Sequence, residues 1–282
     1  MSSHGGGWQE VGDRVYRFRY RSLDLNVGAV LGDDEVLVVD TRSFAAEAVE
    51  LLADLRALTP LPCRQVVNTH WHYDHCYGNA TLRPAAIWGH RRCIERLRGG
   101  DAERRRELLA DHPEIAGELA AVVLDPPDRP VDDAGTALEV GGRRVELRWC
   151  GRGHTDHDLV VVVPDAGVVF AGDLVEEGAP PSYGTDAYPL EWPATLDRLL
   201  DLAAPVVVGG HGDVVGHGFV RGQREQLAAM AALYRRVAAG ELPAEAAVQA
   251  APFPETFARD ALALSGAAGP AGGAAPGTAR SG

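Results

Sequence analysis

The 282-residue chain contains no lysine, so all 27 of its basic residues are arginines. Without lysine there is no side-chain amine that could form a Schiff base, and the lysine of a phosphate-binding P-loop is missing. Acidic residues number 40, which gives a formal net charge of −13. Surfaces that bind nucleic acid or anionic membranes are normally basic, so this balance argues against both and favours a small-molecule substrate as the partner.

Cysteine and long apolar runs are also scarce. Cys63, Cys76, Cys93 and Cys150 show no Cys-x-x-Cys spacing, which indicates buried reduced thiols rather than a zinc ribbon or a disulfide framework. No run approaches the ~18 apolar residues of a membrane span, and residues 1–9 lack the apolar segment of a signal peptide. We therefore expect a cytoplasmic protein. No motif specifies its oligomeric state.

The most informative stretch is residues 66–75, where an apolar strand runs into three histidines and an aspartate within six residues. On an extended backbone His70 and His72 point to the same side. A helix that begins near Asp74 would bring Asp74 and His75 over the same pocket from the other flank. Imidazole and carboxylate are ligands that zinc accepts. The stretch therefore predicts a metal site rather than a solvated polar loop.

This cluster resembles the His-x-His-x-Asp-His signature of the metallo-β-lactamase superfamily. Further motifs of that family follow in the same order, with Gly-His-Thr at 153–155, Gly-Asp at 172–173 and Gly-Gly-His-Gly at 209–212. The resemblance implies two zinc ions, or iron as the alternative. It assigns His70, His72 and His154 to one metal, Asp74, His75 and His211 to a second, and Asp173 as the bridge between them. It also implies that Asp40 supports a ligand histidine, although a strand-end aspartate fits a simple loop cap equally well.

Apolar periodicity divides the chain into two β-rich halves, each followed by helices. Strands are expected at 15–20, 25–31, 35–40, 65–68, 85–89, 158–163 and 168–171, with a hairpin over 138–149. Helices are expected over 44–58, 91–123 with a new start at Pro113, 193–202 and 219–239. This α/β order is consistent with the four-layer αββα sandwich that the resemblance implies. One domain is expected over 1–265, followed by a disordered Gly-, Ala- and Pro-rich tail over 266–282.

The predicted chemistry is hydrolysis, because a metal pair lowers the pKa of a shared water to about 7 and supplies hydroxide at neutral pH. The expected substrate is a carboxylic derivative of a small metabolite, either a thioester, a lactone or a cyclic amide such as a β-lactam. Asp74 is the candidate catalytic residue, which would orient the nucleophile or accept its proton. Lactamases of the family usually lack an aspartate at the position of Asp173, which argues against a β-lactam as the native substrate. An iron-dependent persulfide dioxygenase and a phosphodiesterase are the alternatives within the resemblance.

The loop after Asp173 is the candidate for substrate recognition. Tyr183, Tyr188 and Trp192 are suited to a rigid pocket wall, but they would equally serve to pack the loop down. His157 follows the second motif closely and is interpreted as structural rather than as a ligand. The arginines between 91 and 106 alternate with glutamates, which is more typical of a solvated helix face than of an anion site. His4, His90, His112 and His217 lie outside the motifs and are expected to be ordinary histidines.

Overall fold

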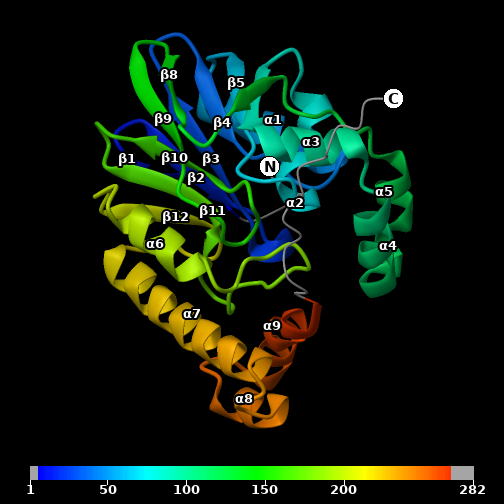
Figure 1. The fold of residues 1–282 in the computed structure, drawn as a ribbon. Helices are drawn as coiled ribbons and strands as arrows, with labels where there is room; N and C mark the ends of the chain where they lie inside the picture. The colour runs from blue at the N-terminus through cyan, green and yellow to red at the C-terminus, as the bar shows by residue number, and fades with distance from the viewer. Residues whose placement is uncertain (1–5, 268–282) are drawn as a thin grey trace, which may run out of the picture.

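The computed structural model describes residues 6–267 of the chain, with side chains as far as residue 264. Within this part the strands form two sheets (Figure 1). The first sheet has the order β1 (Gln9–Gly12), β2 (Val15–Arg19), β3 (Asn26–Leu31), β4 (Val36–Val39), β5 (Cys63–Val67), β6 (Ala86–His90) and β7 (Arg129–Val131). The second has the order β12 (Val206–His211), β11 (Val168–Glu176), β10 (Leu159–Val163), β9 (Arg143–Trp149) and β8 (Thr136–Val140).

Helices connect and cover these sheets. The α-helices are α1 (Ala45–Leu58), α2 (Tyr73–Cys76), α3 (Arg91–Gly99), α4 (Ala102–Asp111), α5 (Ala116–Ala121), α6 (Trp192–Leu200), α7 (His217–Ala238), α8 (Ala244–Ala250) and α9 (Glu255–Ala267). Short 3₁₀ turns are η1 (Ser22–Asp24), η2 (Asn79–Leu82) and η3 (Pro113–Ile115). No helix among the described residues is both long enough and apolar enough to cross a membrane.

The side-chain alternation of the strands builds the layers. In β4, Leu37 and Val39 belong to the core between the two sheets, whereas Val36 and Val38 belong to the core on the other face, against α1. Successive residues of a strand point to opposite faces, so a strand that is apolar throughout must be buried on both. The second sheet packs its outer face on α6 and α7 through Trp192 and Leu227. The result is the αββα order of layers that the family resemblance implies (Figure 1).

Most predicted elements are present, with ends shifted by one or two residues. The predicted end of the strand at 168–171 is wrong, because β11 continues to Glu176. Gly172 adopts a φ of +54°, and the pairing with β12 shifts register there and resumes at Glu176. A glycine can take this conformation at no steric cost, so the strand bends without ending. Asp173 therefore lies within a strand.

The C-terminal part contains helices that the sequence interpretation did not include. Helices α8 and α9 pack on α7 through a separate apolar cluster that contains Met230, Tyr234, Val248 and Phe253. Of the predicted tail over 266–282, Gly266 and Ala267 belong to α9, and the remaining residues lie outside the described part. Strands β1, β7 and β12 were also missed. Strands β1 and β7, of four and three residues, show too little periodicity to be recognised.

Candidate metal centre

Parallel strand pairs bring the predicted ligands to one end of the sandwich. In the first sheet Val39 pairs with Val67, so that Asp40 and the histidine loop emerge side by side. In the second sheet Gly172 pairs with Gly209, and Glu176 pairs with His211, which places Asp173 next to the end of β12. The carboxyl ends of parallel strands share an edge, and the loops that follow them converge there. Asp74 and His75 occupy the single turn of α2, where the sequence predicts a helix start.

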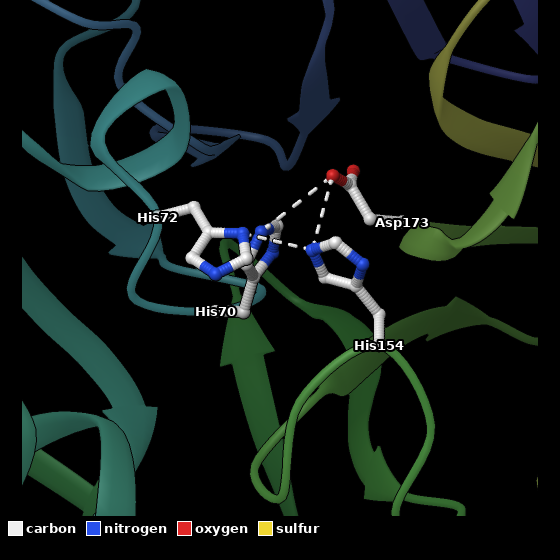
Figure 2. A group of neighbouring side chains, drawn as sticks. All are labelled: His70, His72, His154 and Asp173. Atoms are coloured by element: carbon white, nitrogen blue, oxygen red, sulfur yellow. Dashed lines mark hydrogen bonds and ion pairs between the residues drawn. The ribbon is translucent and has the colours of Figure 1, made fainter. Parts of the chain in front are cut away.

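The first ligand group combines His70, His72, His154 and Asp173. All four side chains are buried, and one ligand atom from each lies within 4.8 Å of the others. Figure 2 shows the imidazoles of His70 and His72, which belong to one loop, converging with the side chains of His154 and Asp173 from two other segments. Oδ2 of Asp173 is 3.6 Å from Nε2 of both His70 and His154. Nε2 of His154 lies 2.8 Å from Nδ1 of His72.

The second group combines Asp74, His75 and His211, again within 4.8 Å of one another. Oδ2 of Asp74 is 3.4 Å from Nε2 of His75 and 3.5 Å from Nε2 of His211. Asp173 reaches this group as well, because its Oδ1 is 3.2 Å from His75 Nε2 and its Oδ2 is 3.4 Å from His211 Nε2. The carboxylate of Asp173 therefore lies between the two groups, in the position of a bridge.

These residues fit a pair of zinc ions. Nε2 of His70, Nε2 of His75 and Oδ1 of Asp173 are buried polar atoms with no hydrogen-bond partner in the described part. Such atoms are costly and rare unless something binds them. Zinc with bonds of about 2.0–2.1 Å in tetrahedral geometry holds its ligand atoms roughly 3.3 Å apart, close to most of the separations found here. The neighbouring Cys76 does not join the group, because its thiol donates to the carbonyl of Trp71 over 3.0 Å.

Each of the five histidines has its second ring nitrogen engaged, which fixes the ring and directs the other nitrogen to the centre. This arrangement is the usual support of a metal-binding imidazole. The partners are Thr69 Oγ1 for His70 at 3.1 Å, Asp186 Oδ2 for His72 at 3.4 Å, Asp40 Oδ2 for His75 at 2.8 Å, the Ser182 carbonyl for His154 at 3.1 Å and the Leu23 carbonyl for His211 at 2.8 Å.

Asp40 has the supporting position that the sequence suggested. It is buried at a φ of +67° and accepts hydrogen bonds from the backbone N–H and the hydroxyl of Thr69, each at 2.8 Å, besides its contact with His75. A second aspartate repeats the arrangement in the other half of the chain. Asp158 accepts from the backbone N–H and the hydroxyl of Thr155, at 2.8 and 2.7 Å, directly after His154. In both places a buried aspartate thus holds the threonine that stands next to a ligand histidine, Thr69 beside His70 and Thr155 beside His154.

Two of these supporting aspartates were missed. Asp158 had a local signal, since Thr155 and Asp158 are three residues apart and that spacing suits a side-chain hydrogen bond to the backbone. Asp186 had no such signal. It lies on a loop more than 110 positions from the residues it contacts, accepting a hydrogen bond of 2.6 Å from Nε1 of Trp71 and lying against His72.

Carboxylates dominate the electrostatics of the second group. Burial opposes protonation of His211, but the charges of Asp173 and Asp74 outweigh it and raise the pKa to about 10. Burial, reinforced by the charge of Asp173, also raises the pKa of Glu176 to about 7. In the first group, by contrast, burial lowers the pKa of His72 to about 4. Metal binding at the second group must therefore displace protons and is expected to weaken as the pH falls.

His157 is fully buried but belongs to neither ligand group. Its Nδ1 lies 2.6 Å from Oδ1 of Asp156, and its backbone N–H donates to the hydroxyl of Thr155. Among the other histidines, His90 is buried against Asp133, and His112 is exposed beside Glu114. His217 begins α7, and His4 lies outside the described residues.

Alanine at His154 or His211 is expected to weaken zinc binding by more than about 100-fold, because loss of a residue that only supports a ligand already costs about 10–100-fold. His157→Ala should keep the metal content of the parent protein. Zinc per chain, measured after dialysis against a weak chelator, checks both expectations. Loss of zinc in the His157 variant would reverse the assignment.

The prediction that Trp192 forms part of a substrate-recognition wall is wrong. Its side chain is fully buried, its Nε1 donates to the carbonyl of Leu174 over 3.2 Å, and its ring centroid is 5.7 Å from that of His154. Trp192 supports the site from behind and has no surface to offer a substrate. Tyr183 packs between Trp192 and Phe253, at centroid distances of 5.5 and 6.4 Å. Tyr188 lines a neighbouring cavity together with Asp186.

Trp192→Ala is expected to lower the free energy of unfolding by about 3–5 kcal/mol, the usual cost of truncating a buried tryptophan. Chemical denaturation checks this, with Leu190→Ala as the control because Leu190 is 40% exposed and surface changes stay within about 0.5 kcal/mol. A Trp192 variant of unchanged stability and altered substrate preference would restore the interpretation as a pocket wall.

Comparison with known proteins decides the family. A family model described as "Metallo-beta-lactamase superfamily" matches residues 23–211, a range that is well over half of the chain and contains all seven predicted ligands. The chain belongs to the metallo-beta-lactamase superfamily. The fold and the family expected from the sequence are thereby confirmed.

Individual members of the metallo-beta-lactamase superfamily are similar to the chain at low identity. It is 28% identical over 159 residues to metallo-beta-lactamase type 2 of Bacillus cereus, covering 55% of this chain and 54% of that protein, so it spans about half the length of that relative. The corresponding protein of Bacteroides fragilis is 31% identical over 218 residues, covering 73% and 79%. The solved structure of FIM-1 from Pseudomonas aeruginosa matches with a TM-score of 0.62 at 19% identity, covering 79% and 95%, which shows the shared fold.

Proposed function

We propose that this protein is a dinuclear zinc hydrolase that cleaves a carboxylic derivative of a small metabolite, either a thioester, a lactone or a cyclic amide such as a β-lactam. The observation that carries the proposal is the position of Asp173. Its two oxygens lie 3.2–3.6 Å from histidine nitrogens of both ligand groups. A single metal would need only one of these groups.

Each zinc would be held by a separate set of residues. His70, His72 and His154 would hold the first ion, Asp74, His75 and His211 would hold the second, and Asp173 would contact both. When bound, two zinc ions polarise a substrate oxygen and lower the pKa of a water between them. The chain provides a buried, rigid frame, because Asp40, Asp158 and Asp186 fix the ligand loops.

Asp74 is the residue proposed to handle the nucleophile. Its Oδ2 lies near both His75 and His211, and the residue lines a cavity of about 460 Å³ together with Asp173. A carboxylate in this position can hold an attacking water in line with the substrate carbonyl and accept its proton. Both of these roles require contact with the cavity.

The named relatives support hydrolysis without defining the substrate. Two are named metallo-beta-lactamases, and one, from Pseudomonas sp. (strain ATCC 19151), is named linear primary-alkylsulfatase, 22% identical over 213 residues covering 64% of this chain and 40% of that protein. The aspartate at position 173 favours a thioester or lactone over a β-lactam as the native substrate. An iron-dependent persulfide dioxygenase needs one metal and leaves the second group without a role, and a phosphodiesterase acting on nucleic acid conflicts with the net charge of −13.

Metal analysis followed by a substrate panel tests the proposal. We expect about two zinc ions per chain, and hydrolysis of at least one class among thioesters, lactones, β-lactams and phosphodiesters. Chelation should abolish turnover, and added zinc should restore it. One iron per chain with oxygen uptake would instead identify the dioxygenase, and a stable protein that binds no metal would contradict both.

A further inference from the structure

Three consecutive arginines on α4, Arg104, Arg105 and Arg106, lie in different surroundings. Arg105 is a structural clamp, because it donates to both oxygens of Asp101 at 2.7 and 2.8 Å and to the carbonyl of Leu119. Arg106 is exposed and reaches only the carbonyl of Ala102, at 3.4 Å. Arg104 lines the cavity that contains the two ligand groups. The alternating pattern predicted a solvated face for all three. Arg106 agrees with that prediction, whereas for Arg104 and Arg105 it is wrong.

The guanidinium of Arg104 is only weakly paired within the described part of the chain. Its one hydrogen-bond contact is to Oε2 of Glu107, at the long distance of 3.4 Å. Its Nε is buried and has no hydrogen-bond partner there, while the side chain as a whole is 22% exposed. A buried N–H group without an acceptor carries a desolvation cost that a ligand can relieve.

The carboxylates that share the cavity with Arg104 already have other partners. Apart from the proposed zinc ligands, they are Asp24, Glu176 and Glu177. Asp24 is paired with Arg19, Glu176 accepts from the backbone N–H of Ser182 over 2.9 Å, and Glu177 accepts from that of Asp213 over 2.8 Å. Setting aside the ligand histidines, Arg104 is the only basic side chain among the described residues on this cavity wall.

We propose that Arg104 binds a carboxylate group of the substrate and so selects acidic over neutral substrates in the hydrolysis proposed above. The planar guanidinium matches a carboxylate in shape and can donate two parallel hydrogen bonds to it, including one from Nε. A carboxylate carries one negative charge. A doubly charged phosphate would meet Asp24, Glu176 and Glu177 with only one arginine to offset them, so a monoanion fits this wall better.

This inference rests on the proposed function for its role in turnover, but the binding step can be measured alone. Two thiols that differ only in one end group, 4-mercaptobutanoate and 4-mercaptobutanamide, serve as probes, because the thiolate is a zinc ligand. Isothermal titration calorimetry on the zinc-loaded full chain gives the ratio of their affinities. The parent protein should prefer the carboxylate by at least tenfold, which corresponds to about 1.4 kcal/mol.

Arg104→Gln should remove most of this preference while the affinity for the amide stays the same. Arg104→Lys should retain part of it, since the charge remains and the paired hydrogen bonds are lost. Arg106→Gln is the matched control on the same helix and should behave as the parent protein. A preference that is unchanged in Arg104→Gln, or no preference in the parent protein, would overturn the proposal.

Measurements of turnover distinguish failure of the Arg104 proposal from failure of the hydrolase proposal. If a hydrolysed thioester, lactone or β-lactam is found, its acidic and neutral forms should differ in kcat/KM by about tenfold or more in the parent protein. Arg104→Gln should lower only the value for the acidic form. Equal losses for both forms would make Arg104 a structural residue. If no substrate is hydrolysed, the hydrolase proposal fails, and the calorimetric ratio still decides whether Arg104 binds a carboxylate.

Discussion

Asp173→Ala is expected to reduce bound zinc below two ions per chain and to abolish hydrolysis, while the fold survives. The substitution removes a side chain whose oxygens approach His70, His75, His154 and His211 together. The two ligand groups would then have no carboxylate in common. Since changes in residues that only support a ligand cost about 10–100-fold in metal affinity, losing the shared ligand should exceed that range.

The fold should tolerate the loss of Asp173 because the carboxylate is not part of a core. It is 5% exposed and lies at the cavity, and its Oδ1 makes no hydrogen bond within the described residues. Zinc per chain, the hydrolysis rate and the circular dichroism spectrum are the measurements. Asp197→Ala, which removes an exposed partner of Arg224, is the control and should leave all three unchanged. Full zinc content and rate in the Asp173 variant would remove this residue from the centre.

The first ligand loop could be predicted from residues alone because its chemistry is local in the sequence: four candidate ligands fall within residues 70–75, directly after a buried strand. Short-range periodicity is sufficient to place such a loop at a strand end. The later ligands His154, Asp173 and His211 were assigned through the resemblance to the family, whose motifs occur here in the same order. The αββα order was implied by the resemblance to the family, and strands such as β4, which are apolar on both faces, agree with it.

Support across long sequence distances could not be predicted. Asp186 contacts Trp71 and His72 only because the loop before α6 folds over the histidine loop. Arg104 lines the cavity, and α4 packs on the histidine loop through an apolar cluster that contains Trp71, Cys76 and Leu108. The sequence neighbours of Arg104 lie on other sides of the helix. Both depend on packing between distant elements, and no periodic pattern records that packing.

The error at Trp192 had a different cause, because the signal was present. Trp192, Leu196 and Leu199 are spaced four and three residues apart, which is the spacing of one helix face, and all three are buried against the second sheet. Treating Trp192 as the end of an aromatic loop placed it outside the helix that it begins. Helix starts next to proline are easily assigned one residue late, since Pro193 occupies the first turn.

The structure also explains why the Gly-Gly-His-Gly motif at 209–212 contains glycine at positions 209 and 210. A side chain at Gly209 would bring its Cβ to 2.3 Å from the carbonyl oxygen of Val175, and one at Gly210 would bring it to 1.7 Å from Oδ1 of Asp173. Strand β12 therefore needs both glycines to approach β11 closely enough for His211 and Asp173 to meet. The motif therefore supplies the ligand His211 and, through its glycines, leaves room for the carboxylate of Asp173.

Gly210→Ala is therefore expected to damage the metal centre although it changes no ligand. The added methyl group must displace the carboxylate of Asp173 or push β12 away from β11, and either movement separates the two ligand groups. We expect zinc affinity to fall by about 10–100-fold, the range for changes that misplace a ligand, and hydrolysis to fall with it. Gly218→Ala is the matched control, because a Cβ there meets nothing within 4 Å. In a helix that change should be neutral or stabilise the fold by up to about 1 kcal/mol. A Gly210 variant that holds two zinc ions with the affinity of the parent protein would show that Asp173 does not occupy this position when metal is bound.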